Sequence, residues 1–282
     1  MRTRFVALRS GLRVRVVEAG DAGAPAIVLV PGWGCGAWIF HENLREIANS
    51  GFHVIAVELK GHGLSDKPRE PSEYTADSMR DHLLEILDSL GLSKAALVGH
   101  SMGAAIVASV AALAPDRVSG VVLVVPVGFA GVRGMTLFRA ITPRFAIPLL
   151  PLLATRALVR LMLSVAYGSR RRASPRDVDE FWAPTQFPDF TRALRHLLHE
   201  FEWAALFPRM EVPWMTVVGT DDSLSPASDV ARYAGASGRQ PAIVIEGGGH
   251  VMFDETPAIV NRSIADFFRT DARSGYISTQ NE

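Results

Sequence analysis

A serine set between two glycines marks the part of this sequence best suited to covalent catalysis. The residues Gly99-His100-Ser101-Met102-Gly103 follow the apolar run Ala95–Val98 and lead into an alanine-rich stretch. A serine on a sharp turn between a strand and a helix exposes its Oγ, and the flanking glycines leave room for that turn. The pattern predicts Ser101 as a nucleophile. It also predicts that the Met102 N–H, at the helix N-terminus, donates to an oxyanion.

A serine nucleophile needs a base, and His250 is the best placed of the eight histidines. It follows the predicted strand Ala242–Ile245 and the glycines 247–249. This puts it at the carboxyl end of a strand, where open α/β sheets place their sites. His100, by contrast, lies inside the serine turn, where we expect it to point away from Oγ. The sequence therefore predicts His250 as the base.

The base needs a carboxylate to orient it, and two adjacent candidates follow the predicted strand Trp214–Val218. These are Asp221 and Asp222, while the loop after the preceding strand, 126–129, contains no acid. We choose Asp222 and keep Asp221 as the alternative. The resulting order along the chain, serine then aspartate then histidine, is the one expected of a nucleophile-turn fold.

The second oxyanion donor is expected in the loop 31–38, which follows the predicted strand Ile27–Val30. Glycines at 32, 34 and 36 let this backbone approach a reacting centre. We assign the backbone N–H of Trp33, paired with that of Met102. Only the main chain of Trp33 is needed, so its indole is free to pack elsewhere.

The sequence gives little support to a metal or cofactor site, and we expect neither. His196 and His199 lie beside Glu200, but we expect exposed polar residues of a helix there rather than metal ligands. The single cysteine, Cys35, excludes an internal disulfide framework and a cysteine-based metal cage.

A dinucleotide-binding loop is a rival interpretation of the glycines 32, 34 and 36, because Glu58 ends the next predicted strand. The third glycine is misplaced for that fingerprint, however, and Trp33 is a poor neighbour for a pyrophosphate. We therefore disfavour it. A small-ligand receptor with the same fold is a further, remote alternative.

The elements that must position these residues alternate between short apolar runs and helical stretches. This pattern predicts a doubly wound, mostly parallel α/β sheet that opens with an antiparallel hairpin around Ser10 and Gly11. The predicted strands are 5–8, 12–17, Ile27–Val30, Val54–Val57, Ala95–Val98, Val121–Val125, Trp214–Val218 and Ala242–Ile245, and the predicted helices are Trp38–Asn49, Asp77–Leu90, Met102–Ala114, Pro226–Ala234 and Pro257–Phe268.

The alternation stops between residues 128 and 208, where arginines, prolines and apolar helical stretches take over. We predict a helical cap over 128–208, a core formed by 1–127 and 209–270, and a polar C-terminal tail over 271–282. The stretch Phe145–Tyr167 is apolar, but prolines and arginines interrupt it well before the length of a membrane span. The apolar cap is also a possible homodimer surface.

Composition narrows the class of partner. The chain of 282 residues has 29 basic and 29 acidic side chains, so its overall charge offers no attraction to nucleic acid or to an anionic membrane. We expect the run Arg170-Arg171-Arg172 to be a solvated surface. The N-terminus lacks the apolar core of a signal peptide, and the cytoplasm is the expected location.

Together, these motifs resemble the α/β-hydrolase superfamily, in particular its capped serine esterase-like branch. The resemblance runs from about Val14 to Phe268 and includes Gly99–Gly103, Gly219-x-x-Asp222 with Pro226, and Gly249-His250 followed by Glu255-x-Pro257. It implies a hydrolase without a cofactor whose small-molecule substrate lies between sheet and cap. The resemblance also includes the dehalogenase and epoxide-hydrolase branches, which attack with aspartate, and Ser101 argues against both.

Two departures from the family pattern stand out. Pro31 takes the place of the histidine often found before the oxyanion glycine, and Glu58 replaces the aspartate of the motif that continues to Ser65. We expect the glutamate to alter a structural turn rather than the mechanism.

The resemblance does not identify the bond that is cleaved. Carboxylic esters of small to medium acyl chains are the predicted substrates, through an acyl-enzyme intermediate. Thioesters, lactones, perhydrolysis and C–C cleavage of vinylogous diketones use the same residues and stay open.

Overall fold

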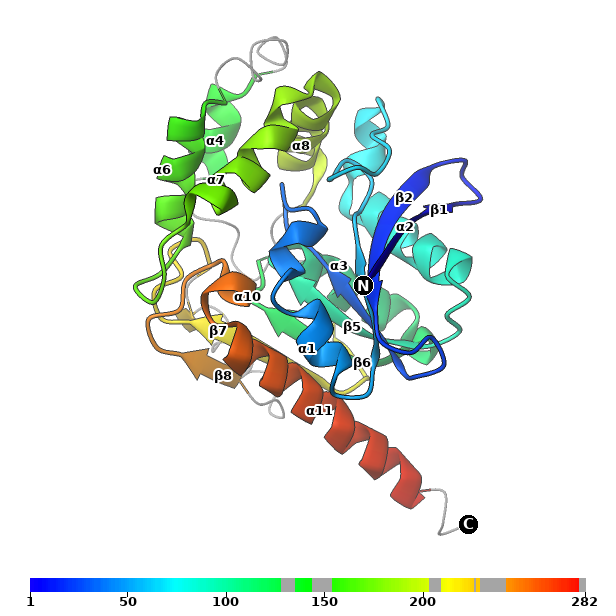
Figure 1. The fold of residues 1–282 in the computed structure, drawn as a ribbon. Helices are drawn as coiled ribbons and strands as arrows, with labels where there is room; N and C mark the ends of the chain where they lie inside the picture. The colour runs from blue at the N-terminus through cyan, green and yellow to red at the C-terminus, as the bar shows by residue number, and fades with distance from the viewer. Residues whose placement is uncertain (128–134, 144–153, 203–208, 226, 229–241, 279–282) are drawn as a thin grey trace.

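The computed structural model describes residues 1–127, 135–143, 154–202, 209–225, 227–228 and 242–278. Within this part of the chain the strands form one sheet in the order β1-β2-β4-β3-β5-β6-β7-β8 (Figure 1). The strands are β1 Arg2–Ala7, β2 Arg13–Ala19, β3 Ala26–Val30, β4 His53–Val57, β5 Ala95–His100, β6 Val118–Val124, β7 Trp214–Gly219 and β8 Ala242–Ile245. β1, β2 and β4 pair antiparallel and all other neighbours pair parallel, which confirms the predicted fold class.

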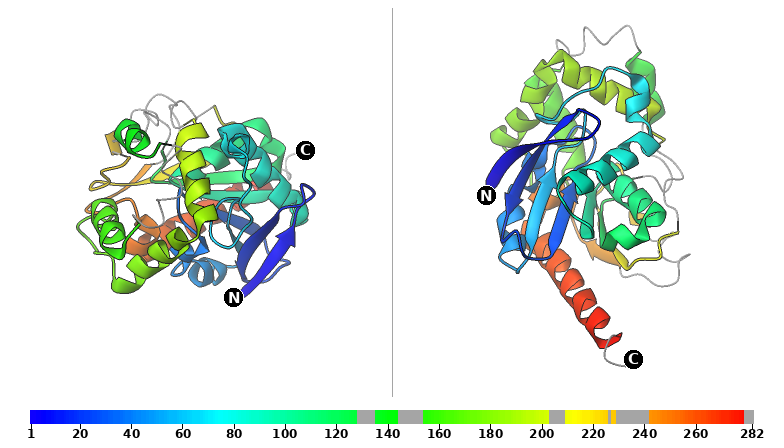
Figure 2. Two further views of the ribbon diagram at one scale, coloured as in Figure 1. Left: turned by 90° about the horizontal axis from the view of Figure 1, so that it is seen from above. Right: turned by 90° about the vertical axis from the view of Figure 1, so that its right-hand side faces the viewer.

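Helices cover both faces of the sheet (Figures 1 and 2). α1 (Leu44–Ala48) and α11 (Pro257–Ser278) contact each other on one face, and α2 (Ala76–Ser89) and α3 (Met102–Leu113) contact each other on the other. α2 is amphipathic and begins where the Thr75 side chain accepts a hydrogen bond from the Ser78 N–H. α3 is apolar on nearly all sides because it lies between α2 and the sheet.

The central strands separate the core into two apolar layers. In β3, Val28 and Val30 belong to one layer, and Ile27 and Leu29 belong to the other. Side chains alternate across a strand, so a strand with helices on both faces needs an unbroken apolar run. This explains why these strands could be recognised in the sequence.

The chain between β6 and β7 contains the cap helices, which we define as α4 (Met135–Ile141), α6 (Arg156–Ala166), α7 (Pro175–Trp182) and α8 (Pro188–Glu200). They gather above one end of the sheet (Figure 1). α7 starts with a capping box between Ser174 and Asp177. The Arg139 guanidinium of α4 donates to the Leu198 carbonyl at the end of α8, at 2.7 Å.

Short helical turns complete the described chain. They are η1 Ala37–Phe40, η2 Pro71–Tyr74, η3 Pro115–Arg117, η5 Ala183–Gln186 and α10 Met252–Glu255. No helix in the described ranges combines the length and apolarity needed to cross a membrane.

The fold differs from the sequence predictions most clearly in three places. The single helix expected over Trp38–Asn49 is divided into η1 and α1, because the backbone N–H groups of His41 and Asn43 donate to carbonyls three residues back rather than four. The buried Asn43 amide donates to Asn261 Oδ1 at 2.8 Å. β8 was expected to be buried on both faces, but it forms the edge of the sheet and its Val244 is 57% exposed.

The third difference is at the C-terminus. The helix predicted over Pro257–Phe268 continues to Ser278 in α11, so the segment expected as a polar tail from residue 271 is helical up to that residue. No proline interrupts this stretch, so an established helix can propagate through it. The helix predicted over Pro226–Ala234 lies outside the described residues except at 227 and 228, which are helical.

Candidate active site

Ser101 lies on the turn between β5 and α3. Its backbone has φ +54° and ψ −117°, a conformation that residues other than glycine rarely adopt. The flanking glycines make this turn possible. A Cβ atom on Gly99 would lie 2.4 Å from the Gly103 carbonyl oxygen, and one on Gly103 would lie 2.3 Å from that of Val30. The backbone is therefore strained at the one residue whose Oγ has to be presented.

The structure brings Ser101, His250 and Asp222 together from three separate loops. His250 Nε2 lies 2.8 Å from Ser101 Oγ, and His250 Nδ1 lies 2.8 Å from Asp222 Oδ2. Asp222 can only accept, so Nδ1–H donates to it and Nε2 is left to accept the serine proton. Asp221 does not reach His250; it is exposed and its carboxylate accepts from the Ser169 N–H at 3.1 Å.

The surroundings of Asp222 favour its charged form. Burial raises the pKa of Asp222, but the charge of His250 and its hydrogen bond, together with two backbone amides, outweigh burial and hold the pKa below its ordinary value. These amides belong to Leu224 and Ser225 and donate to Oδ1 at 2.8 and 2.9 Å. Asp222 is therefore suited to stabilising a positive charge on His250.

Glu255 holds the loop of His250 from both sides, a role the sequence did not reveal. Its buried carboxylate accepts from the backbone N–H groups of Gly249 and Val251, both at 3.1 Å, and from that of Gly168 at 2.8 Å. Burial raises the pKa of Glu255, and the three amides offset part of this rise. The only sequence signal for Glu255 was its place in the family motif.

His100 supports the base from beneath, another contact the sequence did not reveal. Its Nε2 lies 2.8 Å from the backbone carbonyl oxygen of His250, and the two ring centroids are 5.3 Å apart. Burial lowers the pKa of His100 to about 3, which keeps the ring neutral. The hydrogen bond described for His100 Nε2 is to the His250 main chain, while Ser101 Oγ is bonded by His250 Nε2.

The loop after β3 passes directly over the nucleophile. A Cβ on Gly32 would lie 2.8 Å from the Cβ of Ser101 and 2.9 Å from His100 Nδ1, so only glycine fits. Trp33 follows, and its indole N–H donates to the Leu194 carbonyl of α8 at 2.9 Å. Met102 is the first residue of α3, where a backbone N–H has no partner within the helix.

Glu58 acts as a structural link between two loops. Its carboxylate accepts from the Ala37 N–H at 3.0 Å, the Leu64 N–H at 2.7 Å and the Arg15 guanidinium at 2.8 Å, and the residue is only 2% exposed. These bonds occupy both carboxylate oxygens, so Glu58 does not present an acceptor for a ribose hydroxyl. The geometry thus opposes a dinucleotide site.

The expectation that His196 is exposed was wrong. It is buried in α8 and stacks on the Tyr74 ring at 5.6 Å, because this face of α8 packs on the η2 segment. His199 contacts the Thr142 hydroxyl at 3.3 Å and is partly exposed. In the described part of the chain no three His, Cys, Asp or Glu side chains come together as a metal ion would require.

The arginine run 170–172 is solvated only in part. Arg170 and Arg172 are exposed as expected, whereas Arg171 is half-buried. Its guanidinium pairs with Asp254 and with Asp177, the latter at 3.1 Å. Arg171 thus ties the loop after α6 to α7 and α10.

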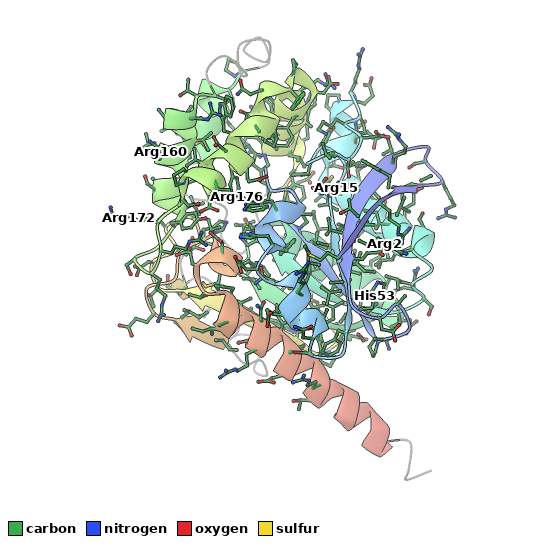
Figure 3. All side chains as sticks on the ribbon, viewed as in Figure 1. Arg2, Arg15, His53, Arg160, Arg172 and Arg176 are labelled. Carbon is green, nitrogen blue, oxygen red and sulfur yellow. The ribbon has the colours of Figure 1, made fainter. Side chains whose placement is uncertain are left out.

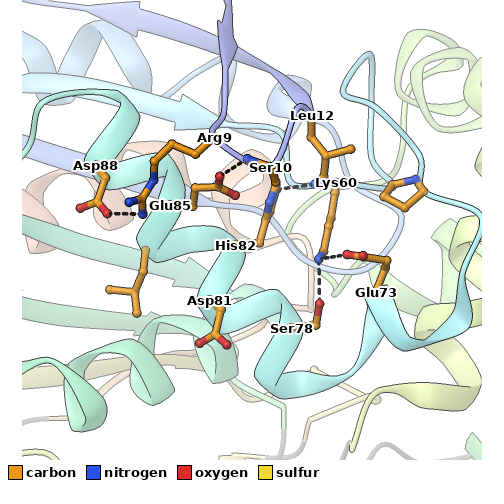
Figure 4. A pocket seen from close by; sticks show the side chains of 12 residues that line it. Arg9, Ser10, Leu12, Lys60, Glu73, Ser78, Asp81, His82, Glu85 and Asp88 are labelled. Atoms are coloured by element: carbon orange, nitrogen blue, oxygen red, sulfur yellow. Dashed lines mark hydrogen bonds and ion pairs between the residues drawn. The ribbon is translucent and has the colours of Figure 1, made fainter.

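A surface groove of about 660 Å³ lies between the β1–β2 turn and α2, and no residue of the triad lines it. Both of its cationic side chains, Arg9 and Lys60, already bind acidic side chains of the same groove (Figure 4). Lys60 Nζ donates to Glu73 and Ser78, and Arg9 pairs with Asp88. We assign the groove no ligand.

Comparisons with known proteins agree with this fold. A family model described as the alpha/beta hydrolase fold matches residues 25–257. Epoxide hydrolase A of Mycobacterium tuberculosis is 36% identical over 112 residues, which cover 40% of this chain and 35% of that protein. A putative non-heme haloperoxidase of Mycobacterium phage D29 is 37% identical over 123 residues, 44% of this chain and 43% of that protein.

The matched segment spans about a third of the length of the first of these relatives. Among solved structures, a haloalkane dehalogenase from Bradyrhizobium elkani superimposes with a TM-score of 0.82 at 21% identity and covers 97% of this chain and 99% of its own. This likeness concerns the fold alone. The family model, which matches most of the chain, shows that the protein belongs to the α/β hydrolase fold family.

Proposed function

We propose that this protein is a serine hydrolase that cleaves carboxylic esters through an acyl-enzyme intermediate. One observation carries the proposal: His250 Nε2 lies 2.8 Å from Ser101 Oγ while His250 Nδ1 lies 2.8 Å from the Asp222 carboxylate. A hydroxyl, an imidazole and a carboxylate joined in this order by hydrogen bonds form the arrangement that activates a serine nucleophile.

The proposed reaction has two halves. His250 takes the Ser101 proton as Oγ attacks the ester carbonyl, and the same proton then passes from His250 to the leaving alcohol. A water molecule next gives its proton to His250 and attacks the acyl-enzyme, which releases the acid and returns the proton to Ser101. Asp222 stabilises the imidazolium in both halves. The N–H groups of Trp33 and Met102 are the proposed donors to the oxyanion.

The relatives named epoxide hydrolase do not lead us to propose epoxide opening here. The resemblance noted above assigns those branches an aspartate nucleophile, and this chain has serine at that position. We further infer that 128–208 forms a cap over the core formed by 1–127 and 209–270, with the substrate between the two. Small to medium acyl chains are the proposed substrates, and thioesters and C–C bonds remain alternatives for the same triad.

A fluorophosphonate probe together with a panel of esters tests the proposal. We expect the probe to modify Ser101 in the wild type, located by peptide mass spectrometry, and hydrolysis of p-nitrophenyl esters to fall by several orders of magnitude in Ser101→Ala. Ser263→Ala, on the partly exposed side of α11, is the matched control and should behave as wild type.

Two results would overturn the proposal. One is retention of near-wild-type hydrolysis by Ser101→Ala. The other is a wild type that neither reacts with the probe nor cleaves any ester from acetate to palmitate. Activity on a thioester or diketone panel, lost in Ser101→Ala, would keep the triad but replace the substrate class.

A further inference from the structure

The charges of this neutral chain are distributed very unevenly. Residues 128–176 contain nine arginines and no lysine, aspartate or glutamate, whereas the rest of the chain has 20 basic and 29 acidic side chains. The net charge of zero is therefore the sum of a charge of +9 on residues 128–176 and a charge of −9 on the rest of the chain. Such separation orients a molecule in front of a charged surface even when its total charge is zero.

Most of the described arginines of this segment lie on α6, in the loop after it and at the start of α7. Arg160, Arg170, Arg172 and Arg176 are exposed. Figure 3 places Arg160 and Arg172 at the outer edge of the cap helices, and neither forms an ion pair with any described residue. Arg156 is engaged differently, because it pairs with Asp179 at 2.5 Å. At least two cations thus remain for an external partner.

The same helix also exposes an apolar stripe. Its members are spaced i, i+3, i+4 and i+7 and are between 39% and 61% exposed: Leu158, Leu161, Met162 and Val165. Only a narrow side of α6, with Val159 and Leu163, is buried against the rest of the protein. Scattered exposed leucines are ordinary on a protein surface, whereas four on one helix face form a patch.

We propose that α6, the loop 168–174 and the start of α7 dock on the surface of an anionic phospholipid bilayer. A helix that combines exposed apolar side chains with arginines fits the boundary between headgroups and acyl chains, where it lies in the membrane plane. The arginines bind lipid phosphates, and the apolar stripe enters the boundary region.

Two other occupants fit the surface less well. Nucleic acid would match the arginines, but it would leave the apolar stripe of α6 without a partner. A second copy of the chain on a two-fold axis would bring the same arginine-rich segment against itself, which is repulsive. The bilayer is the occupant that matches both the charge and the apolar surface.

Co-sedimentation with vesicles tests the proposal independently of any catalytic activity. The vesicles contain either phosphatidylcholine alone or phosphatidylcholine with roughly 30% phosphatidylglycerol, at low and high salt. We expect binding only to the anionic vesicles, and we expect it to weaken at high salt. Arg160→Ala/Arg172→Ala should reduce the partition coefficient at least tenfold, because each cation near the surface contributes about fivefold.

The apolar half of the surface is tested by Leu161→Ser/Met162→Ser, which should also reduce binding at least tenfold. Arg45→Ala/Leu113→Ser removes an exposed arginine and an exposed leucine outside the cap helices and should bind as wild type. Circular dichroism and thermal melting establish that each variant is folded. Hydrolysis of a short, water-soluble ester should be equal in all of them.

Several results would overturn the proposal. They are absence of binding by the wild type, equal binding to both kinds of vesicle, and variants that bind as the wild type does. A dimer in light scattering that dissociates in Leu161→Ser/Met162→Ser would assign the surface to a second copy instead. Since binding is measured without substrate, these outcomes are distinct from failure of the esterase proposal.

Discussion

The backbone carbonyl of Ala166 accepts a hydrogen bond from the backbone N–H of His250 at 2.6 Å. Ala166 ends α6, so a cap helix reaches the loop of the proposed base directly. The next two residues continue the contact, because the Tyr167 hydroxyl donates to Asp254 and the Gly168 N–H donates to Glu255. The position of the imidazole therefore depends on the cap helices as well as on Asp222.

Glu255→Gln tests whether the loop of His250 needs this support. The amide can replace only one of the two acceptor oxygens, so at least one N–H next to His250 loses its partner. We expect kcat for ester hydrolysis to fall by roughly 10- to 100-fold with little change in KM, because misorientation affects the chemical step. Steady-state kinetics provide the measurement, and Glu246→Gln, exposed at the start of the same loop, is the control. Wild-type kcat in Glu255→Gln would show that the loop keeps its shape without the carboxylate.

Gly32→Ala should damage the proposed oxyanion site while leaving the triad chemically intact. The added methyl group would lie 2.8 Å from the Ser101 Cβ, so the loop carrying Trp33 has to shift. Loss of one oxyanion donor typically lowers kcat about 100- to 1000-fold, and we expect an effect toward the lower end. Gly23→Ala is the control, since its Cβ would lie 3.7 Å from the nearest side-chain atom. If kcat in Gly32→Ala equals that of the wild type, Trp33 is not a donor.

Glu58 should contribute to stability rather than to catalysis. Glu58→Gln removes the charge opposite Arg15 and one acceptor, and we expect the free energy of unfolding to fall by about 2–3 kcal/mol. Glu58→Asp restores the residue type of the family motif, but its shorter side chain cannot reach Ala37, Leu64 and Arg15 together, so a loss of about 1 kcal/mol is expected. Urea denaturation measures both, with exposed Glu46→Gln as the control. A Glu58→Asp protein as stable as the wild type would contradict this role.

Three buried histidines predict loss of stability in mild acid. Burial lowers the pKa of His62 to about 4 and those of His82 and His100 to about 3, below the unfolded value near 6.5. Between pH 6.5 and about 4 the unfolded chain therefore binds protons that the folded chain does not, so the free energy of unfolding decreases as the pH falls. Each histidine contributes up to about 1.4 kcal/mol per pH unit.

Urea unfolding at several pH values between about 5 and 7 measures this dependence. Glu255 has the opposite effect on the pH dependence of the free energy of unfolding, because burial raises its pKa and the folded chain then holds a proton that the unfolded chain has lost. This effect amounts to at most one proton. In His82→Gln the slope of the free energy of unfolding against pH should decrease by the equivalent of about one proton. The Gln oxygen can still accept from the Lys60 N–H, as His82 Nε2 does at 2.9 Å. A slope that is the same in wild type and variant would show that His82 is protonated in the folded state.

The parts of the fold that depend on residues close together in the chain could be predicted from the sequence. The central strands are apolar on both faces, and the turn at Ser101 tolerates only glycine at positions 99 and 103. Both constraints act over a few residues, so they are visible as runs and spacings. The helix predicted over 38–49 was wrong where the buried Asn43 lies, and the partner of its side chain, Asn261, is more than two hundred residues away and so leaves no local signal.

The sequence by itself determined the sheet and the order of the three proposed catalytic residues. It favoured Asp222 but left the adjacent Asp221 as an alternative, because only the course of the loop decides which carboxylate meets His250 Nδ1. Nor did it indicate that Glu255, His100 and the end of α6 hold His250 in place. Those contacts join segments far apart in the chain, and tertiary packing alone sets the distances between them.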